Sequence, residues 1–300
     1  MIEAHNVMKN YGSVSALVNF EMLVETNNVH AIIGPNGSGK STLIKILSTE
    51  LKPDSGDITI NGVPITNTKE IRSMVSVVPD LTRIPDNRTP RKLLWDAGKA
   101  SRLSREEIQY RVDVLAESLQ IGSEFDRRVG EMSKGIKRRV SLGMALICDS
   151  SVLLMDGSLA ELDPGFSVKF MNMLKEPHDK TVIFTANNMN FIDNVCDSVT
   201  IIRNGATIMN ESITSIRGKI GRPGVMLKLS PMNVQRVAAL LRQQLFANRI
   251  TVNEDSILVE VDDLLHIPAV IRMVSNYTEV YEARKTMTSL EDMYHAFIES

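Results

Sequence analysis

Short apolar runs, separated by polar turns and by stretches of helical periodicity, follow one another through much of the first 215 residues. Runs of this length, bounded by turn residues, are typical of buried strands. The runs that predict strands cover residues 2–8, 16–24, 29–33, 57–62, 74–78, 152–155, 181–185 and 199–203. Strands alternating with helices indicate an α/β fold with a mostly parallel sheet, and the first strands indicate an antiparallel β portion beside it.

Between about residues 88 and 135 the apolar residues follow a helical periodicity in place of the strand pattern. Ser104 followed by Glu107 is a capping box, in which each residue satisfies a free backbone N–H group at the start of a helix. Apolar residues then recur at the spacing of one helix face, at Ile108, Val112, Leu115, Ala116 and Leu119. We therefore expect a helical insert here, followed by a helix over residues 136–147.

Glycine and proline crowd between residues 217 and 224, which predicts a linker. Beyond it the pattern predicts strands at 225–229, 257–261 and 279–284, with helices at 234–245 and 264–274 between them. The expected organisation is thus a large α/β domain over residues 1–216 and a small α+β domain over residues 225–300.

Composition narrows the class of protein. The 300 residues are 43% hydrophobic and 23% charged, as in an ordinary globular protein, and a net charge of −2 gives no general attraction to nucleic acid. We expect no membrane-spanning segment, since no apolar run reaches about 18 residues. We also expect no secretion signal at the N-terminus. The two cysteines, Cys148 and Cys196, have no metal-ligand spacing and indicate a reduced, cytosolic protein.

The strongest chemical signal is the stretch Gly-Pro-Asn-Gly-Ser-Gly-Lys-Ser-Thr at residues 34–42, which fits the phosphate-loop pattern G-x-x-x-x-G-K-[ST]. Glycines let the main chain turn tightly, so that its N–H groups point at phosphate oxygens. Lys40 supplies a positive charge, and the Ser41 hydroxyl can bind Mg²⁺. The residues expected to hold a nucleotide here are Gly34, Asn36, Gly37, Ser38, Gly39, Lys40, Ser41 and Thr42.

A second chemical signal, a carboxylate, follows the predicted strand 152–155. Asp156 at the end of that strand can hold the Mg²⁺ of a loop-bound nucleotide through water. With the phosphate loop before it and further motifs in order, the chain resembles the ATP-binding subunits of ABC transporters over about residues 2–215. A P-loop kinase or switch protein is the less favoured class, because about 90 residues separate the phosphate loop from the motif at Ser133.

Three shorter motifs carry the resemblance. Tyr11, in Lys-Asn-Tyr-Gly, occupies the position of an aromatic residue that stacks on adenine. The segment 132–136 occupies the position of the family signature LSGGQ. The resemblance implies that Ser133 and Gly135 reach across a dimer to the phosphate held by a partner. Leu162-Asp163-Pro164 matches the loop after the magnesium strand, and Asp163 either faces a dimer or caps the next helix. We interpret the basic run 137–139 as helix surface.

The signature has Lys134 and Ile136 in place of Gly and Gln, and three positions outside it also depart from the family pattern. Gly157 stands where the family has the glutamate that polarises the attacking water, and Asn187 stands where it has a switch histidine. Asp80 replaces a glutamine and can still bind Mg²⁺. General-base help is worth about 10²–10⁴-fold in rate. We therefore expect ATP and Mg²⁺ to bind, with Ser41, Asp80 and Asp156 near the metal, and hydrolysis to be slow. No catalytic residue is assigned.

The resemblance implies an energy-coupling subunit that acts on a separate transmembrane subunit, at the inner face of the cell membrane. The C-terminal stretch 288–293, Thr-Ser-Leu-Glu-Asp-Met, resembles exporter-type subunits. A second ATP-binding subunit is expected. It is either a different chain, giving one active and one inert site, or a second copy that clamps on ATP. The alternative is an ABC-type clamp acting on ribosomes or DNA, which would usually show tandem cassettes or a coiled coil.

Overall fold

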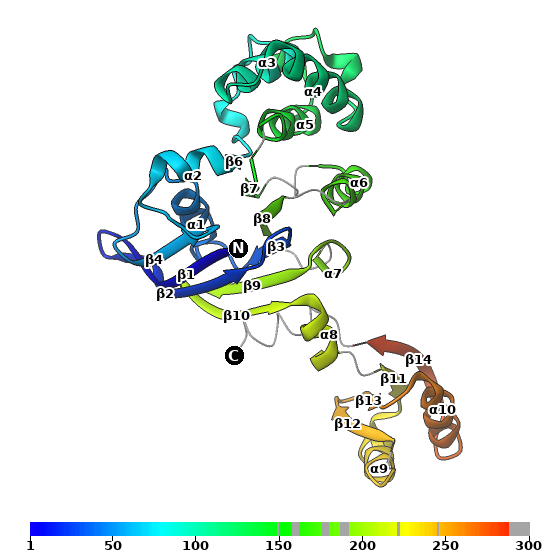
Figure 1. Cartoon of the computed structure of the whole chain (residues 1–300). Coiled ribbons are helices and arrows are strands. Elements are labelled where there is room, and N and C mark those ends of the chain that lie inside the picture. The colour runs from blue at the N-terminus through cyan, green and yellow to red at the C-terminus, as the bar shows by residue number, and fades with distance from the viewer. Residues whose placement is uncertain are drawn as a thin grey trace. The chain divides into compact units, whose positions relative to one another are not determined.

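The computed structural model describes residues 1–148, 150–157, 162–175, 180–186, 192–220, 223–244 and 246–287. The chain divides into two compact units, Met1–Ile213 and Thr214–Ser300 (Figure 1). Each unit has a hydrophobic core of its own. Among the helices in the described ranges, none is long and apolar enough to cross a membrane.

A six-stranded sheet forms the centre of the N-terminal unit. Its order is β10 (Ala206–Ser212), β9 (Ser198–Arg203), β3 (Val29–Ile33), β8 (Thr181–Ala186), β7 (Val152–Met155) and β6 (Val75–Val77). All neighbours run parallel except β10, which is antiparallel to β9. Every residue of β3 and β7 is buried, as expected for strands covered on both faces. Because the strands are parallel, the segments after β3, β7 and β8 emerge at one edge of the sheet.

An antiparallel sheet lies beside this centre. Its order is β2 (Val14–Val24), β1 (Ile2–Tyr11), β4 (Ser55–Ile60) and β5 (Val63–Pro64). One apolar cluster joins this sheet to the helix α1 (Lys40–Leu47) and to the central sheet, through residues such as Phe20, Leu43 and Leu154. The helix after the phosphate loop is thus held between two sheets.

The helical insert follows β6. Besides α1, the described part of the N-terminal unit contains the helices α2 (Thr68–Met74), α3 (Pro90–Ala100), α4 (Arg105–Ser118), α5 (Lys134–Leu146), α6 (Pro164–Lys175) and α7 (Ile192–Val195), with the 3₁₀ turns η1 (Leu81–Arg83), η2 (Gly122–Glu124) and η3 (Val129–Glu131). Both halves of the predicted capping box are present at the start of α4: Ser104 Oγ accepts from Glu107 N–H and Glu107 Oε2 accepts from Ser104 N–H. Helices α3, α4 and α5 pack together in the upper part of Figure 1.

The C-terminal unit has the order strand, helix, strand, strand, helix, strand. These elements are β11 (Pro223–Leu229), α9 (Pro231–Leu241), β12 (Ala247–Val252), β13 (Ser256–Val261), α10 (Ile267–Ser275) and β14 (Val280–Met287), with the 3₁₀ turn η5 (Leu264–His266) before α10. The sheet is antiparallel in the order β12-β13-β11-β14, which is a ferredoxin-like arrangement. Apolar residues of α9 and α10 join those of the strands in one core.

The expected fold class, a P-loop α/β core with an antiparallel β portion and a helical insert, is confirmed. Within the stretch expected to be a linker, residues 217–220 belong to α8 (Ile213–Ile220), and Pro223 and Gly224 begin β11. Buried Ile213 and Ile216 anchor α8 and outweigh its glycine. The predicted helix 234–245 ends earlier, with α9 at Leu241. The pattern also missed α2, β10 and β12, whose side chains are mostly partly exposed and carry little apolar periodicity.

The centre of β3 carries a fully buried histidine. His30 Nδ1 lies 2.6 Å from Ser198 Oγ, and His30 Nε2 lies 2.8 Å from Thr200 Oγ1. Burial lowers the pKa of His30 from 6.5 to about 3. The ring is therefore neutral in the folded chain and charges readily only after unfolding.

We expect the N-terminal unit to lose stability as the pH falls below 6.5. The unfolded chain takes up a proton near pH 6.5 and the folded chain does not, so stability is complete above that pH and lost below it. Between pH 7 and pH 5 the loss is about 2 kcal/mol. Urea unfolding followed at a series of pH values measures it. In His30→Gln, which cannot titrate, this part of the pH dependence should vanish; an unchanged pH profile would contradict the assignment.

Candidate nucleotide site

The phosphate loop lies between β3 and α1, where its glycines meet two demands. Gly39 caps α1 with φ of +108°, a conformation that L side chains rarely adopt. A Cβ at Gly39 would collide with the carbonyl of Ala16 on β2, and one at Gly34 would collide with the carbonyl of Ile202 on β9. Both close approaches come from strands outside the loop, so the loop is held tightly by its surroundings.

Lys40 and Ser38 give the loop its polar interior. Lys40 is 9% exposed, and its Nζ donates to Gly34 O at 2.7 Å and to Pro35 O at 2.9 Å. Burial lowers the pKa of the Lys40 ammonium, and the nearby Asp156 carboxylate opposes that shift. The hydroxyl of Ser38 is buried without a hydrogen-bond partner. A ligand oxygen would satisfy that hydroxyl, so these residues fit the phosphates of a nucleotide.

The start of α1 offers further donors to the same position. The first N–H groups of a helix have no partner within it, and here Leu43 N–H is the first to reach back, to Gly39 O at 3.0 Å. Gly39 has no side chain to cap the helix. The N–H groups of Lys40, Ser41 and Thr42 therefore precede the first intrahelical bond, at the positive end of the helix dipole.

Asp156 and Gly157 follow β7 at the same edge of the sheet and share one partner on β8. Thr185 Oγ1 donates to Asp156 Oδ1 at 2.7 Å and accepts from Gly157 N–H at 2.7 Å. Gly157 has φ of +63°, and a Cβ placed there would meet no atom within 4 Å. Thr185 thus orients the expected metal carboxylate, a role that sequence analysis missed because a lone threonine inside an apolar strand carries no motif.

Asp80 stands at the start of η1 with its Oδ1 accepting from both Thr82 N–H and Thr82 Oγ1 at 2.9 Å. The bond from Thr82 N–H is the largest cause that lowers the pKa of Asp80. Its carboxylate is ionised and exposed, and one of its oxygens is already used in capping the turn.

Ser133 and Gly135 lie at the start of α5, in the helical part of the unit, whereas the phosphate loop leads into α1 (Figure 1). Ser133 caps α5 through Ile136 N–H at 3.3 Å and is exposed. Tyr11 ends β1 opposite Val14, in the hairpin whose second strand approaches Gly39, and is 47% exposed. Asn187 and the stretch 288–293 lie outside the described residues.

The basic run after Ser133 is not simply helix surface. Arg138 is only 5% exposed and donates to Pro79 O at 3.2 Å. The Arg139 guanidinium lies 3.9 Å from the centre of the Phe166 ring and donates to Asp163 Oδ2 at 2.7 Å. Asp163 also caps α6 by accepting from Phe166 N–H at 2.8 Å. Helix α5 is therefore fastened to the start of α6, and only the charge of the run was visible in the sequence.

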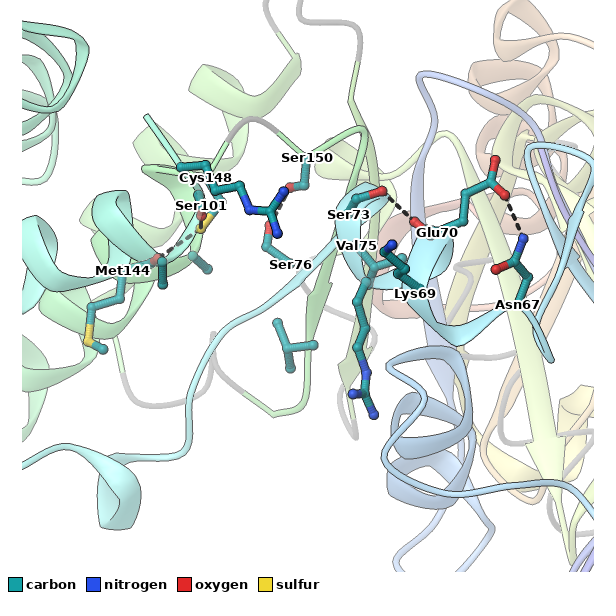
Figure 2. Close-up of a pocket in the computed structure, with 15 residues that line it drawn as sticks. Asn67, Lys69, Glu70, Ser73, Val75, Ser76, Ser101, Met144, Cys148 and Ser150 are labelled. Carbon is teal, nitrogen blue, oxygen red and sulfur yellow. Dashed lines mark hydrogen bonds between the residues drawn. The ribbon is translucent and has the colours of Figure 1, made fainter. Parts of the chain in front are cut away.

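A separate hollow of about 710 Å³ lies between α2 and β6 on one side and the ends of α3 and α5 on the other (Figure 2). Its polar side chains pair largely with one another: Asn67 donates to Glu70, Ser76 bonds with Ser150, and Ser101 donates to Cys148. Ser76 and Ser150 mark the beginning of β6 and β7, whereas Asp156 follows the end of β7. The hollow is thus distinct from the phosphate loop, which does not line it.

Comparison with known proteins agrees with this geometry. A family model described as ABC transporter matches residues 17–160. A Nod factor export ATP-binding protein I from Burkholderia lata is 30% identical over 210 residues, which are 69% of each chain. The linearmycin resistance ATP-binding protein LnrL of Bacillus subtilis is 26% identical over 282 residues, 93% of this chain and 90% of the relative. A solved ATP-binding subunit of an ABC transporter, 24% identical, has a TM-score of 0.66 over 73% of this chain and 92% of its own, which supports the fold.

A glycine-rich loop between a buried parallel strand and a helix, with a carboxylate after a nearby strand, defines a P-loop nucleotide-binding fold. Within that class, the chain belongs to the ABC transporter family as an ATP-binding subunit.

Proposed function

We propose that this subunit binds ATP with Mg²⁺ firmly, hydrolyses it slowly in its own site, and uses the binding energy to drive an exporter. The observation that carries the proposal is the contrast within one site. The phosphate loop keeps every residue type of the binding pattern, whereas Gly157 follows Asp156 with no side chain at all.

Binding follows from the loop geometry. Lys40, Ser38 and the N–H groups at the start of α1 all belong to the phosphate loop or to the helix that follows it, and all are groups that favour an anion; Tyr11 offers an aromatic face for the base. Mg²⁺, when bound, would supply positive charge that offsets the charge of the phosphates. Ser41, Asp156 and Asp80 are the residues that would hold it. Thr185 fixes the orientation of Asp156 by its hydrogen bond.

Slow hydrolysis follows from the missing base. An attacking water needs a group that accepts its proton, and Gly157 has no side chain that could accept it. Asn187, at the family's switch position, carries an amide that can donate a hydrogen bond but cannot carry a charge. Neither difference removes a group that binds the phosphates, so this chain keeps ATP binding while its rate of ATP hydrolysis is low.

The partners follow from the signature segment and from the family. Ser133 and Gly135 begin a helix whose N-terminus is exposed, and there they complete the nucleotide site of a second ATP-binding subunit. The machinery acts on a separate transmembrane subunit at the cytoplasmic face of the membrane. Export is supported by relatives whose names state Nod factor export and linearmycin resistance.

Two measurements on the purified full-length chain test the proposal. Titration with a fluorescent ATP analogue and Mg²⁺ should show saturable binding. With the chain in excess over radiolabelled ATP, most of the label should be recovered as ATP after many dissociation times. The absence of saturable binding contradicts the first half of the proposal, and rapid appearance of ADP contradicts the second.

A further inference from the structure

In the described part of the C-terminal unit, β14 is one of the two edge strands of the sheet, the other being β12. Among the strands that the structure describes, β14 pairs with β11 alone, on one side. The five consecutive residues from Tyr281 to Lys285 are all exposed. Alternate N–H and C=O groups of an edge strand point outward without a sheet partner, and such an edge can accept another strand.

The side chains of β14 alternate between two faces in a known register. Ala283 lies opposite Leu227, which is buried in the core beneath the helices. Glu282 and Arg284 lie opposite Lys228 and Met226, and so point to the other face of the sheet. Glu282 and Arg284, which carry opposite charges, therefore share one face of the sheet, and Ala283 lies between them along the chain.

This order of charges is self-complementary. If two copies of β14 pair antiparallel about a two-fold axis at Ala283, Glu282 of each strand lies directly opposite Arg284 of the other. The next positions outward, Tyr281 and Lys285, bring no like charges together. Moving the axis to a neighbouring residue places Glu282 opposite itself, or Arg284 opposite itself. Opposite charges across a strand pair stabilise it and like charges destabilise it, so one register is selected.

β14 shows only part of the pattern of an edge that is guarded against pairing. Protected edges carry lysines, prolines or strong bulges; β14 has one exposed lysine, Lys285, which would lie opposite Tyr281 in the self-paired register. In β14 the only register shift lies at one end, between Glu282 and Val280, and the strand from Glu282 onward is regular and without proline. The pattern disfavours arbitrary strands and favours a copy of itself.

We propose that β14 pairs with β14 of a second copy of this chain, joining two C-terminal units into one continuous sheet of eight strands. A two-fold contact of this kind uses the same surface on both subunits. A single strand pair buries less than the roughly 1,200 Å² of a stable standard interface, so the dimer should be weak and should form only at the upper end of the concentrations measured. It requires no nucleotide, and its test is therefore separate from that of the proposed function.

Charge reversal on the full-length chain tests the pairing, with nucleotide omitted and EDTA present. In sedimentation velocity over a range of concentrations, the unaltered chain should show a monomer–dimer equilibrium. Glu282→Arg or Arg284→Glu alone sets like charges opposite at two places and should weaken the dimer by about tenfold or more. Arg284→Glu is the cleaner variant, because Arg284 faces Met226 within its own sheet, whereas Glu282 faces Lys228.

The decisive experiment mixes the two charge-reversed variants. A Glu282→Arg chain, with two arginines, matches an Arg284→Glu chain, with two glutamates, at both positions. An equimolar mixture should therefore dimerise about as well as the unaltered chain, although each variant alone dimerises about tenfold or more weakly. The double variant should also recover the dimer. Arg236→Glu, the same change at an exposed site on α9, is the control and should leave the dimer intact. A monomeric unaltered chain, unaffected single variants or a monomeric mixture would each overturn the proposal.

Discussion

Replacing Lys40 with alanine should weaken ATP binding on the order of 100-fold. A hydrogen bond from a charged donor is worth about 1.5–3 kcal/mol, and the Lys40 ammonium is expected to serve two phosphates. The ammonium is buried in the loop and, among the residues that the structure describes, donates to main-chain carbonyls at 2.7 and 2.9 Å, which a phosphate oxygen can replace. Because burial lowers the pKa of Lys40, its charge is costly in the empty site. The variant should therefore melt no earlier than the unaltered chain.

Titration with the fluorescent analogue and a thermal melt check both parts of this prediction. Lys45→Ala is the matched control: Lys45 lies on the same helix, is exposed, and should leave both readings unchanged. Retained affinity in Lys40→Ala would contradict the assigned binding site. A lower melting temperature with lost affinity would instead show that the lysine supports the fold.

Gly157→Glu should raise the rate of ATP hydrolysis by about 100-fold, the lower end of what a general base contributes. The full benefit is not expected, because the backbone at position 157 has φ of +63° and a side chain there costs about 1–2 kcal/mol. A carboxylate has room, since the space around the added Cβ is open. Single-turnover hydrolysis with the chain in excess measures the change.

Gly157→Ala separates strain from chemistry, because it carries the same backbone cost without a carboxylate. It should match the glutamate variant in stability and the unaltered chain in hydrolysis. If the glutamate variant stays as slow as the alanine variant while binding ATP normally, the missing base is not what limits turnover in this site.

The sequence predicted most of the nucleotide core because its signals are local. The phosphate loop needs nine consecutive residues, and the capping box needs Ser104 and Glu107. Strands β3 and β7 are buried on both faces and so read as continuous apolar runs.

What the sequence could not predict depends on partners far apart along the chain. The link from Arg139 to Asp163 joins two helices, and the basic run at 137–139 looks the same whether it faces water or an aromatic ring. Thr185 is ordinary strand sequence until β7 places Asp156 beside it. Helix α8 was not predicted because glycine and proline are local signals, whereas the burial of Ile213 and Ile216 depends on distant packing.

The fastening of α5 to α6 has a mechanical consequence. An ion pair and a ring contact at Arg139 leave little freedom for one helix to tilt without the other. A pull on Ser133 from a nucleotide held by the neighbouring subunit would therefore displace the start of α6, a short stretch of chain away from Asp156. Nucleotide bound in one site would therefore change the affinity of the other site, so the two subunits of a dimer would bind nucleotide cooperatively.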